Sequence, residues 1–163
     1  MTEETRQTLI LWAETYNDPQ YFQEDPIAFP TLFAQRFKAG KRSLADVEIA
    51  AVFAAHFAWG RRAMIIRDCG RLFEEMDWKP YEYVMRGKWR DDGTSIHRTI
   101  KWSEVAGICS RLKSAYEASP SLESLSQDEF RTNIFGQKSD LKAPNKKINM
   151  MSLPYGRDVL LLS

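Results

Sequence analysis

One four-residue segment has the residue types needed to bind a phosphate group. Trp59 and Gly60 close an apolar run, and Arg61 and Arg62 follow them directly. A helix that starts after the glycine would offer free backbone N–H groups to an anion, and arginine offers a two-pronged donor. Trp59 either stacks on a base or fills the core. The alternative is structural: the segment is only the charged start of a helix after a glycine. In that case the arginines further along the helix, Arg67 and Arg71, would pair with Glu74 and Glu75.

The two histidines lie in different settings. His56 lies inside the apolar run and is either a neutral core histidine with one hydrogen bond or a polar group in a cleft between helices. His97 precedes Arg98 and Thr99 and follows a polar loop, so we expect it at the surface, where it contacts a ligand or is solvated. A small ligand held near both histidines would indicate an enzyme whose class the sequence does not identify.

A second basic segment lies near the C-terminus. Asn145, Lys146 and Lys147, with Asn149 close by, can contact phosphate. A solvated basic tail has the same composition. The sequence leaves both interpretations open.

Metal and cofactor chemistry is not predicted. The two histidines are not in an HxxxH, HxH or HExxH setting, and the chain has no GxGxxG, GxxxxGK[ST] or GxSxG motif. Cys69 and Cys109 are isolated, at apolar helix positions, and are expected to be small buried side chains rather than zinc ligands or a disulfide. We therefore expect no metal, no cofactor and no identifiable catalytic residue.

Charge is distributed unevenly along the chain. The 163 residues have a net charge of +1, which lacks the strong positive field of an obligate nucleic-acid binder. Residues 61–102 carry ten basic and seven acidic side chains, whereas residues 1–60 carry five and eight, and residues 131–163 carry six and two. A nucleic-acid site would therefore be a local basic patch.

Apolar spacing and capping residues predict the helices that must position these side chains. Ser43 begins S-L-A-D, which predicts a helix start with Asp46 in the first turn. From Ile49 to Trp59 the segment is apolar except at His56, a pattern typical of a central helix surrounded by others. Gly60 ends or bends that helix, and an amphipathic helix follows it.

The remaining pattern predicts an all-α protein. We expect one compact domain of about five to seven helices over residues 1–150, followed by an atypical tail over residues 151–163. Only residues 95–102 alternate like a strand. Further helical segments are expected over residues 9–16, in short turns between 19 and 37, over 81–85, from a cap at Ser103 to residue 118, and after the capping box of Ser126 and Glu129.

No membrane or export signal is predicted. The N-terminus is acidic before its short apolar run and has no basic region or small-residue cleavage site. The longest apolar run, Ile49 to Trp59, is too short to span a bilayer. We therefore expect a soluble cytoplasmic protein.

Five short segments, taken together and in order, carry a resemblance to a known family. They are Asp25-Pro26, Asp46-x-Glu48-Ile49-Ala50, Trp59-Gly60-Arg61-Arg62, His97-Arg98-Thr99 and Asn145-Lys146-Lys147-x-Asn149-Met150. This combination resembles an uncharacterised bacterial family of conserved hypothetical proteins, classed as a domain of unknown function. The resemblance covers Tyr16 to Met150.

The resemblance also implies what would follow Met150. In that family the chain continues with a Phe-x-Arg-Trp-Met-Val-Arg stretch and a further half with an Asp-x-His segment, and this half is similar to helix-hairpin-helix DNA glycosylases. Here Met150 is followed by MSLPYGRDVLLLS, which matches neither piece. We therefore expect a truncated or frame-shifted chain, or a natural short form. Because the glycosylase hairpin and its catalytic aspartate or lysine would lie in the missing half, no catalytic residue carries over.

Three functional hypotheses follow. The first is the N-terminal helical part of a glycosylase-like DNA-binding fold that lacks the catalytic half. The second is a helical protein–protein interaction or scaffold module without enzymatic activity, and the third is the small-ligand enzyme. Under the first hypothesis the nucleic-acid-binding candidates are Trp59, Gly60, Arg61, Arg62, His97, Arg98, Asn145, Lys146 and Lys147.

Overall fold

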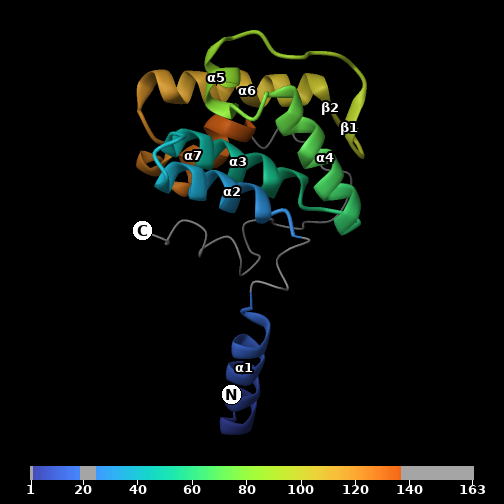
Figure 1. Ribbon diagram of the computed structural model, residues 1–163, viewed down its shortest axis with the longest axis vertical. Helices are drawn as coiled ribbons and strands as arrows, with labels where there is room; N and C mark the ends of the chain where they lie inside the picture. Colours follow the sequence, from blue (N-terminus) through green and yellow to red (C-terminus); the bar gives the residue numbers. More distant parts are fainter. Residues whose placement is uncertain (1, 19–24, 137–163) are drawn as a thin grey trace.

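The computed structural model describes residues 2–18 and 25–136, and in these residues the chain is built almost entirely from helices (Figure 1). The predicted all-α class is therefore confirmed. A two-stranded antiparallel hairpin accompanies the helices. The elements are α1 (Glu3–Tyr16), α2 (Ala28–Lys38), α3 (Leu44–Phe57), α4 (Arg62–Glu75), α5 (Pro80–Met85), β1 (Ser95–His97), β2 (Ile100–Lys101), α6 (Trp102–Ala118), the 3-10 helix η2 (Leu122–Ser124) and α7 (Gln127–Phe135).

Helix α3 is the central element, as its apolar run predicts. The predicted cap at Ser43 is confirmed, because its hydroxyl accepts from the Asp46 N–H at 3.2 Å while the Asp46 carboxylate accepts from the Ser43 N–H at 3.0 Å. Nine of its residues are buried. The expectation that other elements surround it completely is wrong, because Ala55 and Ala58 at its C-terminal end are exposed.

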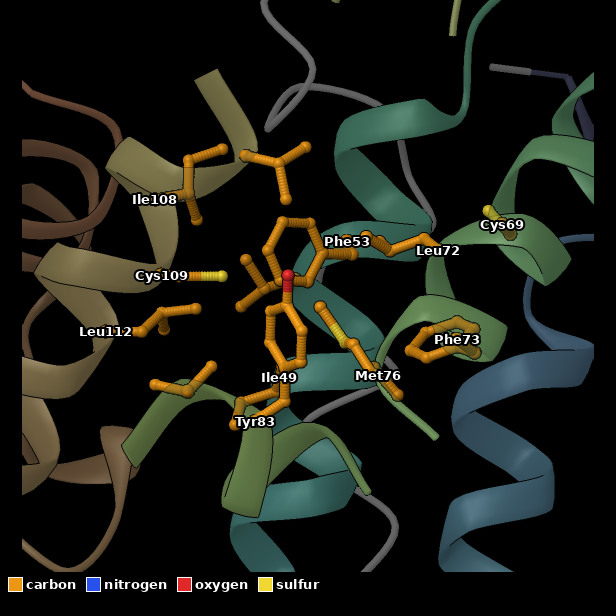
Figure 2. Close-up of a cluster of buried hydrophobic side chains, with 14 of the residues drawn as sticks. Ile49, Phe53, Cys69, Leu72, Phe73, Met76, Tyr83, Ile108, Cys109 and Leu112 are labelled. Carbon is orange, nitrogen blue, oxygen red and sulfur yellow. The ribbon is translucent and has the colours of Figure 1, made fainter. Parts of the chain in front are cut away.

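The centre of the hydrophobic core forms where α4, α5 and α6 meet α3. Figure 2 shows side chains from α3, α4, α5 and α6 converging, with Phe53 and Ile49 of α3 at the centre. Both cysteines lie in this core as free thiols, and burial raises the pKa of each to about 12. They are therefore neutral, and the prediction of small buried side chains is confirmed. The other labelled core residues are Leu72, Phe73, Met76, Tyr83, Ile108 and Leu112.

Two buried carboxylates of α3 connect it to the elements around it. Asp46 accepts from the Tyr81 N–H at the start of α5, at 3.0 Å. Glu48 accepts from the Tyr116 hydroxyl of α6 at 2.8 Å and from the Leu122 N–H of η2 at 3.1 Å, and the Ser121 hydroxyl also donates to it. Carboxylates are buried only when they are paired or hydrogen-bonded. Asp46 and Glu48 therefore fix the position of α3 relative to three neighbouring elements.

The later elements match the sequence expectations with one correction. The strand-like stretch forms the hairpin of β1 and β2, and the predicted capping box of Ser126 and Glu129 starts α7. The predicted cap at Ser103 is wrong. Helix α6 begins one residue earlier at Trp102, and its N-cap residue is Lys101, whose side chain makes no capping hydrogen bond. Strand β2 runs directly into α6, so no separate capping turn is needed.

Helix α1 differs from the other helices in having no buried residue. Figure 1 shows it extending away from the other helices. Its apolar residues Leu9, Ile10, Leu11 and Trp12 have exposed fractions between 40% and 60%. The helix predicted at the N-terminus is therefore present, but its apolar residues are not part of the core.

Two other expectations concern membrane spanning and the C-terminal segment. Within the described residues, no helix combines the length and apolar character that a bilayer crossing requires. The candidate residues Asn145, Lys146 and Lys147, and the tail over residues 151–163, lie outside the described residues.

The contacts of the buried Glu48 predict that its loss destabilises the protein more than the loss of the exposed Glu129. Replacing Glu48 with alanine would leave three donors around it without their acceptor, so we expect urea unfolding to show a loss on the order of 3 kcal/mol. Glu129 is exposed, so its replacement with alanine removes only the capping box and should cost about 1 kcal/mol. Equal losses in the two variants would contradict this role of Glu48.

Candidate functional site

The candidate site lies at the corner between α3 and α4. The chain leaves α3 at Phe57, and Gly60 has a φ of +114°, a conformation that side-chain-bearing residues rarely adopt. Arg61 is extended and is the N-cap residue of α4, and its side chain makes no capping hydrogen bond. The corner therefore presents a helix N-terminus whose first N–H groups are not capped by a side chain.

The hairpin of β1 and β2 packs against α4 and brings a further arginine to this corner. Arg98 lies in the turn of the hairpin with a φ of +51°, and its carbonyl accepts from the Ser95 hydroxyl at 2.6 Å. From α4, Arg71 donates to the carbonyl of Ile96 at 3.3 Å. These bonds fix the hairpin turn next to the helix.

His97 joins the hairpin to the corner from inside the protein. Its Nδ1 is 2.9 Å from a carboxylate oxygen of Asp68, and its Nε2 is 3.0 Å from the carbonyl oxygen of Trp59. The ring is thus held between the Asp68 carboxylate of α4 and the backbone of the corner. Phe57 stacks on it with ring centroids 5.2 Å apart.

The prediction that His97 lies at the surface is wrong, since its exposed fraction is 0%. The polar loop before it and the arginine after it are exposed, but β1 does not alternate regularly: Ile96 and His97 are both buried, and the register is irregular between Ser95 and His97, so that His97 faces inward, against Asp68. Both ring nitrogens are bonded within the protein. His97 is therefore not available to a ligand, and it positions the residues on either side of it.

Asp68 is the anionic centre of the site. Arg67 donates to it at 2.8 Å, and a guanidinium nitrogen of Arg71 lies 3.6 Å away. Burial alone would raise the pKa of this carboxyl, but the hydrogen bonds and positive charges of Arg67 and His97 outweigh it and lower the pKa below the usual range. The expected ion pairs of Arg67 and Arg71 with Glu74 and Glu75 are wrong, because the buried Asp68 attracts both arginines.

Arg98 and Trp59 form a stacked pair above this buried network. The guanidinium carbon of Arg98 lies 4.3 Å from the centre of the Trp59 ring, which is cation–π contact. Gly60 permits this approach, because a Cβ atom there would lie 2.8 Å from Nη1 of Arg98. Glycine is therefore required at position 60 for its backbone conformation, whereas a Cβ atom there would displace the exposed Arg98 side chain from its place over Trp59.

Two more arginines complete the exposed face of the corner. Arg61 and Arg62 are exposed, and Arg62 lies 4.0 Å from the carboxylate of Asp25. Within residues 2–18 and 25–136, Arg61 and Arg98 have no ion pair with a carboxylate. The structure thus brings together six of the nine predicted residues, which are Trp59, Gly60, Arg61, Arg62, His97 and Arg98.

Sequence reasoning missed Asp68, which holds the site together. It lies in the middle of α4, where a single acidic residue between arginines looks like part of a solvated helix face. Its exposed fraction is 1%. The only available signal was its position on the apolar side of the amphipathic helix, next to Cys69. That position does not distinguish a buried aspartate from one at the edge of the apolar side.

His56 is close to the site but does not face a cleft shared with His97. It is half-buried, and its ring stacks on Phe135 of α7 with centroids 5.3 Å apart. Desolvation, and then the charges of His97 and Arg111, lower the pKa of His56 to about 4, so the ring is neutral at pH 7. Its ring nitrogens have no hydrogen-bond partner among the described residues, unlike the single bond expected of a core histidine.

A separate groove of about 370 Å³ lies between α6, η2 and α7. None of the predicted site residues lines it. Its lining combines hydroxyl, apolar and amide groups with one arginine, and consists of Ser110, Arg111, Ser114, Ala115, Ala118, Ser119, Ser121, Leu122, Leu125 and Asn133.

Comparison with known proteins identifies the family of the chain. The family model described as a protein of unknown function, DUF2400, matches residues 25–153, and the chain belongs to this family. The match includes the whole corner and the hairpin, whereas α1 lies before it. No curated protein and no solved structure matches the chain.

The Gly60 conformation predicts a stability loss from backbone strain. Replacing Gly60 with alanine places a side chain at a φ of +114° and displaces the exposed Arg98 guanidinium, so we expect a loss of about 2 kcal/mol in thermal unfolding, most of it from the backbone. Gly40 also has a positive φ, +69°, but nothing lies within 4 Å of its added Cβ. The same change at Gly40 should cost only about 1 kcal/mol. A Gly60 variant no less stable than the Gly40 variant would be inconsistent with the greater strain expected at a φ of +114° than at +69°.

The lowered pKa of His56 predicts a pH dependence between pH 7 and pH 5. Below an unfolded-state pKa of about 6.5, the unfolded chain binds a proton at His56 that the folded chain does not, so stability falls as the pH is lowered. The loss should be about 2 kcal/mol at pH 5. In the His56→Phe variant, which keeps a ring against Phe135, this contribution should be absent. Urea unfolding at both pH values measures it, and an unchanged pH dependence in the variant would disprove it.

Proposed function

We propose that the α3–α4 corner and the hairpin turn bind the phosphate backbone of DNA. The observation that carries this proposal is the convergence of Arg61, Arg62 and Arg98 on the exposed side of one buried network. These three side chains come from segments more than 35 residues apart, and Arg98 reaches the corner only because His97 and Gly60 bring it there. This proposal corresponds to the first hypothesis, in which the chain is the N-terminal helical part of a glycosylase-like DNA-binding fold.

The local charge supports an anionic ligand. The corner carries five arginines, and the carboxylates paired with them are Asp68, which is buried and already bonded, and Asp25, at 4.0 Å from Arg62. Among residues 2–18 and 25–136, no carboxylate compensates the charge of Arg61 or Arg98. Guanidinium groups bind phosphate oxygens with two parallel hydrogen bonds. The ligand that fits this surface is a polymer with regularly spaced phosphates, since the arginines are spread over a face rather than gathered in a pocket.

The start of α4 adds backbone donors to the same face. Its first turn contains no acidic side chain, and its N-cap residue makes no side-chain capping bond. The free N–H groups and the positive end of the helix dipole therefore favour an anion beside Arg61 and Arg62. No reaction is part of this proposal, because His97 is enclosed and the site contains no activated nucleophile.

The second candidate function is a protein–protein interaction module, and α1 is the observation that favours it. Four consecutive apolar residues, Leu9 to Trp12, are exposed on a 14-residue helix. Isolated helices of this length are marginally stable in water, and a helix with apolar residues on several sides is stabilised by being covered. Under this second function, α1 would be the segment that a partner chain covers.

Salt-dependent DNA binding tests the first function. We expect the full chain to bind DNA oligonucleotides, single-stranded and duplex, with an affinity that falls as salt is raised. Changing both Arg61 and Arg62 to alanine removes two phosphate contacts, so the slope of log K against log salt should become shallower by about 2. Fluorescence anisotropy at several salt concentrations measures this slope.

A matched control removes the same charge elsewhere. Lys38 and Lys41 are exposed at the C-terminal end of α2, whereas Asp25 near its N-terminal end reaches the corner. Changing both lysines to alanine should leave the slope unchanged. No DNA binding at low salt would refute the first function. A protein that binds no DNA but associates through α1, so that removing residues 1–17 abolishes the association, would favour the second.

A further inference from the structure

Trp59 is a partly exposed tryptophan at the arginine-rich corner. Its exposed fraction is 36%, whereas Trp102 in the core is exposed by only 1%. Part of Trp59 is therefore exposed next to Arg61 in the chain and to Arg98 over its ring. An exposed aromatic side chain beside cations that have no carboxylate partner in the described part of the chain is the combination by which proteins hold single-stranded nucleic acids.

The position of the Trp59 ring is fixed before any ligand binds. Its own carbonyl accepts from His97 at 3.0 Å, and its ring meets the His97 ring edge-to-face with centroids 5.8 Å apart. The guanidinium carbon of Arg98 lies over the ring, 4.3 Å from its centroid. Binding would therefore cost little side-chain ordering at this position.

We infer that Trp59 stacks on an unpaired base of a nucleic-acid strand whose phosphates contact the neighbouring arginines. This inference rests on the proposed function, and it narrows the ligand to single-stranded or locally unpaired nucleic acid. Arg98 contributes twice, because it holds the indole in place and presents its guanidinium to the strand. A stacking contact of this kind accepts any base, since every base has a π-face.

Trp59 also has a structural role that a test must separate from stacking. It helps to cover the buried His97 and Asp68. Covering them requires an apolar side chain of sufficient size, whereas stacking requires an aromatic ring. Leucine and phenylalanine at position 59 therefore distinguish the two roles.

The test compares two oligonucleotides of equal length that differ only in their bases. One is a single strand of thymidines, and the other is an abasic strand with the same phosphates. We expect the unmodified full chain to bind the thymidine strand about 5- to 100-fold more tightly than the abasic strand. This comparison uses no variant, so it does not depend on whether a Trp59 substitution folds.

Variants at position 59 then assign the preference to this ring. Trp59→Leu should bind both strands with the affinity of the abasic strand, and Trp59→Phe should retain a measurable preference for thymidine. Equal binding of the two strands by the unmodified chain, or a preference that survives in Trp59→Leu, would overturn the stacking inference while leaving phosphate binding intact. Failure of both strands to bind at low salt would overturn the proposed function together with the inference.

Discussion

The candidate site depends on the buried contact between His97 and Asp68. One ring nitrogen of His97 lies 2.9 Å from this carboxylate and the other lies 3.0 Å from the Trp59 carbonyl oxygen, so one ring joins the hairpin, α4 and the α3–α4 corner. A buried pair of this kind is stable only when the remaining hydrogen-bonding capacity of both groups is also satisfied. Arg67 and Arg71 meet that requirement for Asp68 from the solvent side.

The buried Asp68 carboxylate determines which arginines of the corner remain free to bind an anion. Arg67 and Arg71 are used to balance Asp68, and they are therefore poor candidates for binding a second anion. Arg61 and Arg98 face solvent without such a partner among the described residues. The site thus contains two kinds of arginine, those that stabilise the fold and those that remain available, although all of them belong to the basic segment of residues 61–102.

The parts of the fold that the sequence predicted are those set by local chemistry. Ser43 and Ser126 each bond to a carboxylate three residues away, and a short window of sequence contains both partners. The burial of His97 could not be predicted in this way, because Asp68 is 29 residues away and the contact depends on how the hairpin packs. For the same reason, the corner was recognised from residue types, but its stacked pair of Trp59 and Arg98 was not.

The reactivity of the two buried cysteines can be used to measure how often the core opens. Cys69 of α4 and Cys109 of α6 are both fully buried, and their thiols remain protonated at neutral pH. A thiol reacts with an alkylating reagent as its thiolate, so neither side chain is reactive while the helices stay packed. The rate at which each cysteine is modified would therefore report how often its own helix separates from α3, and the two rates would show whether the core opens as one unit or in parts.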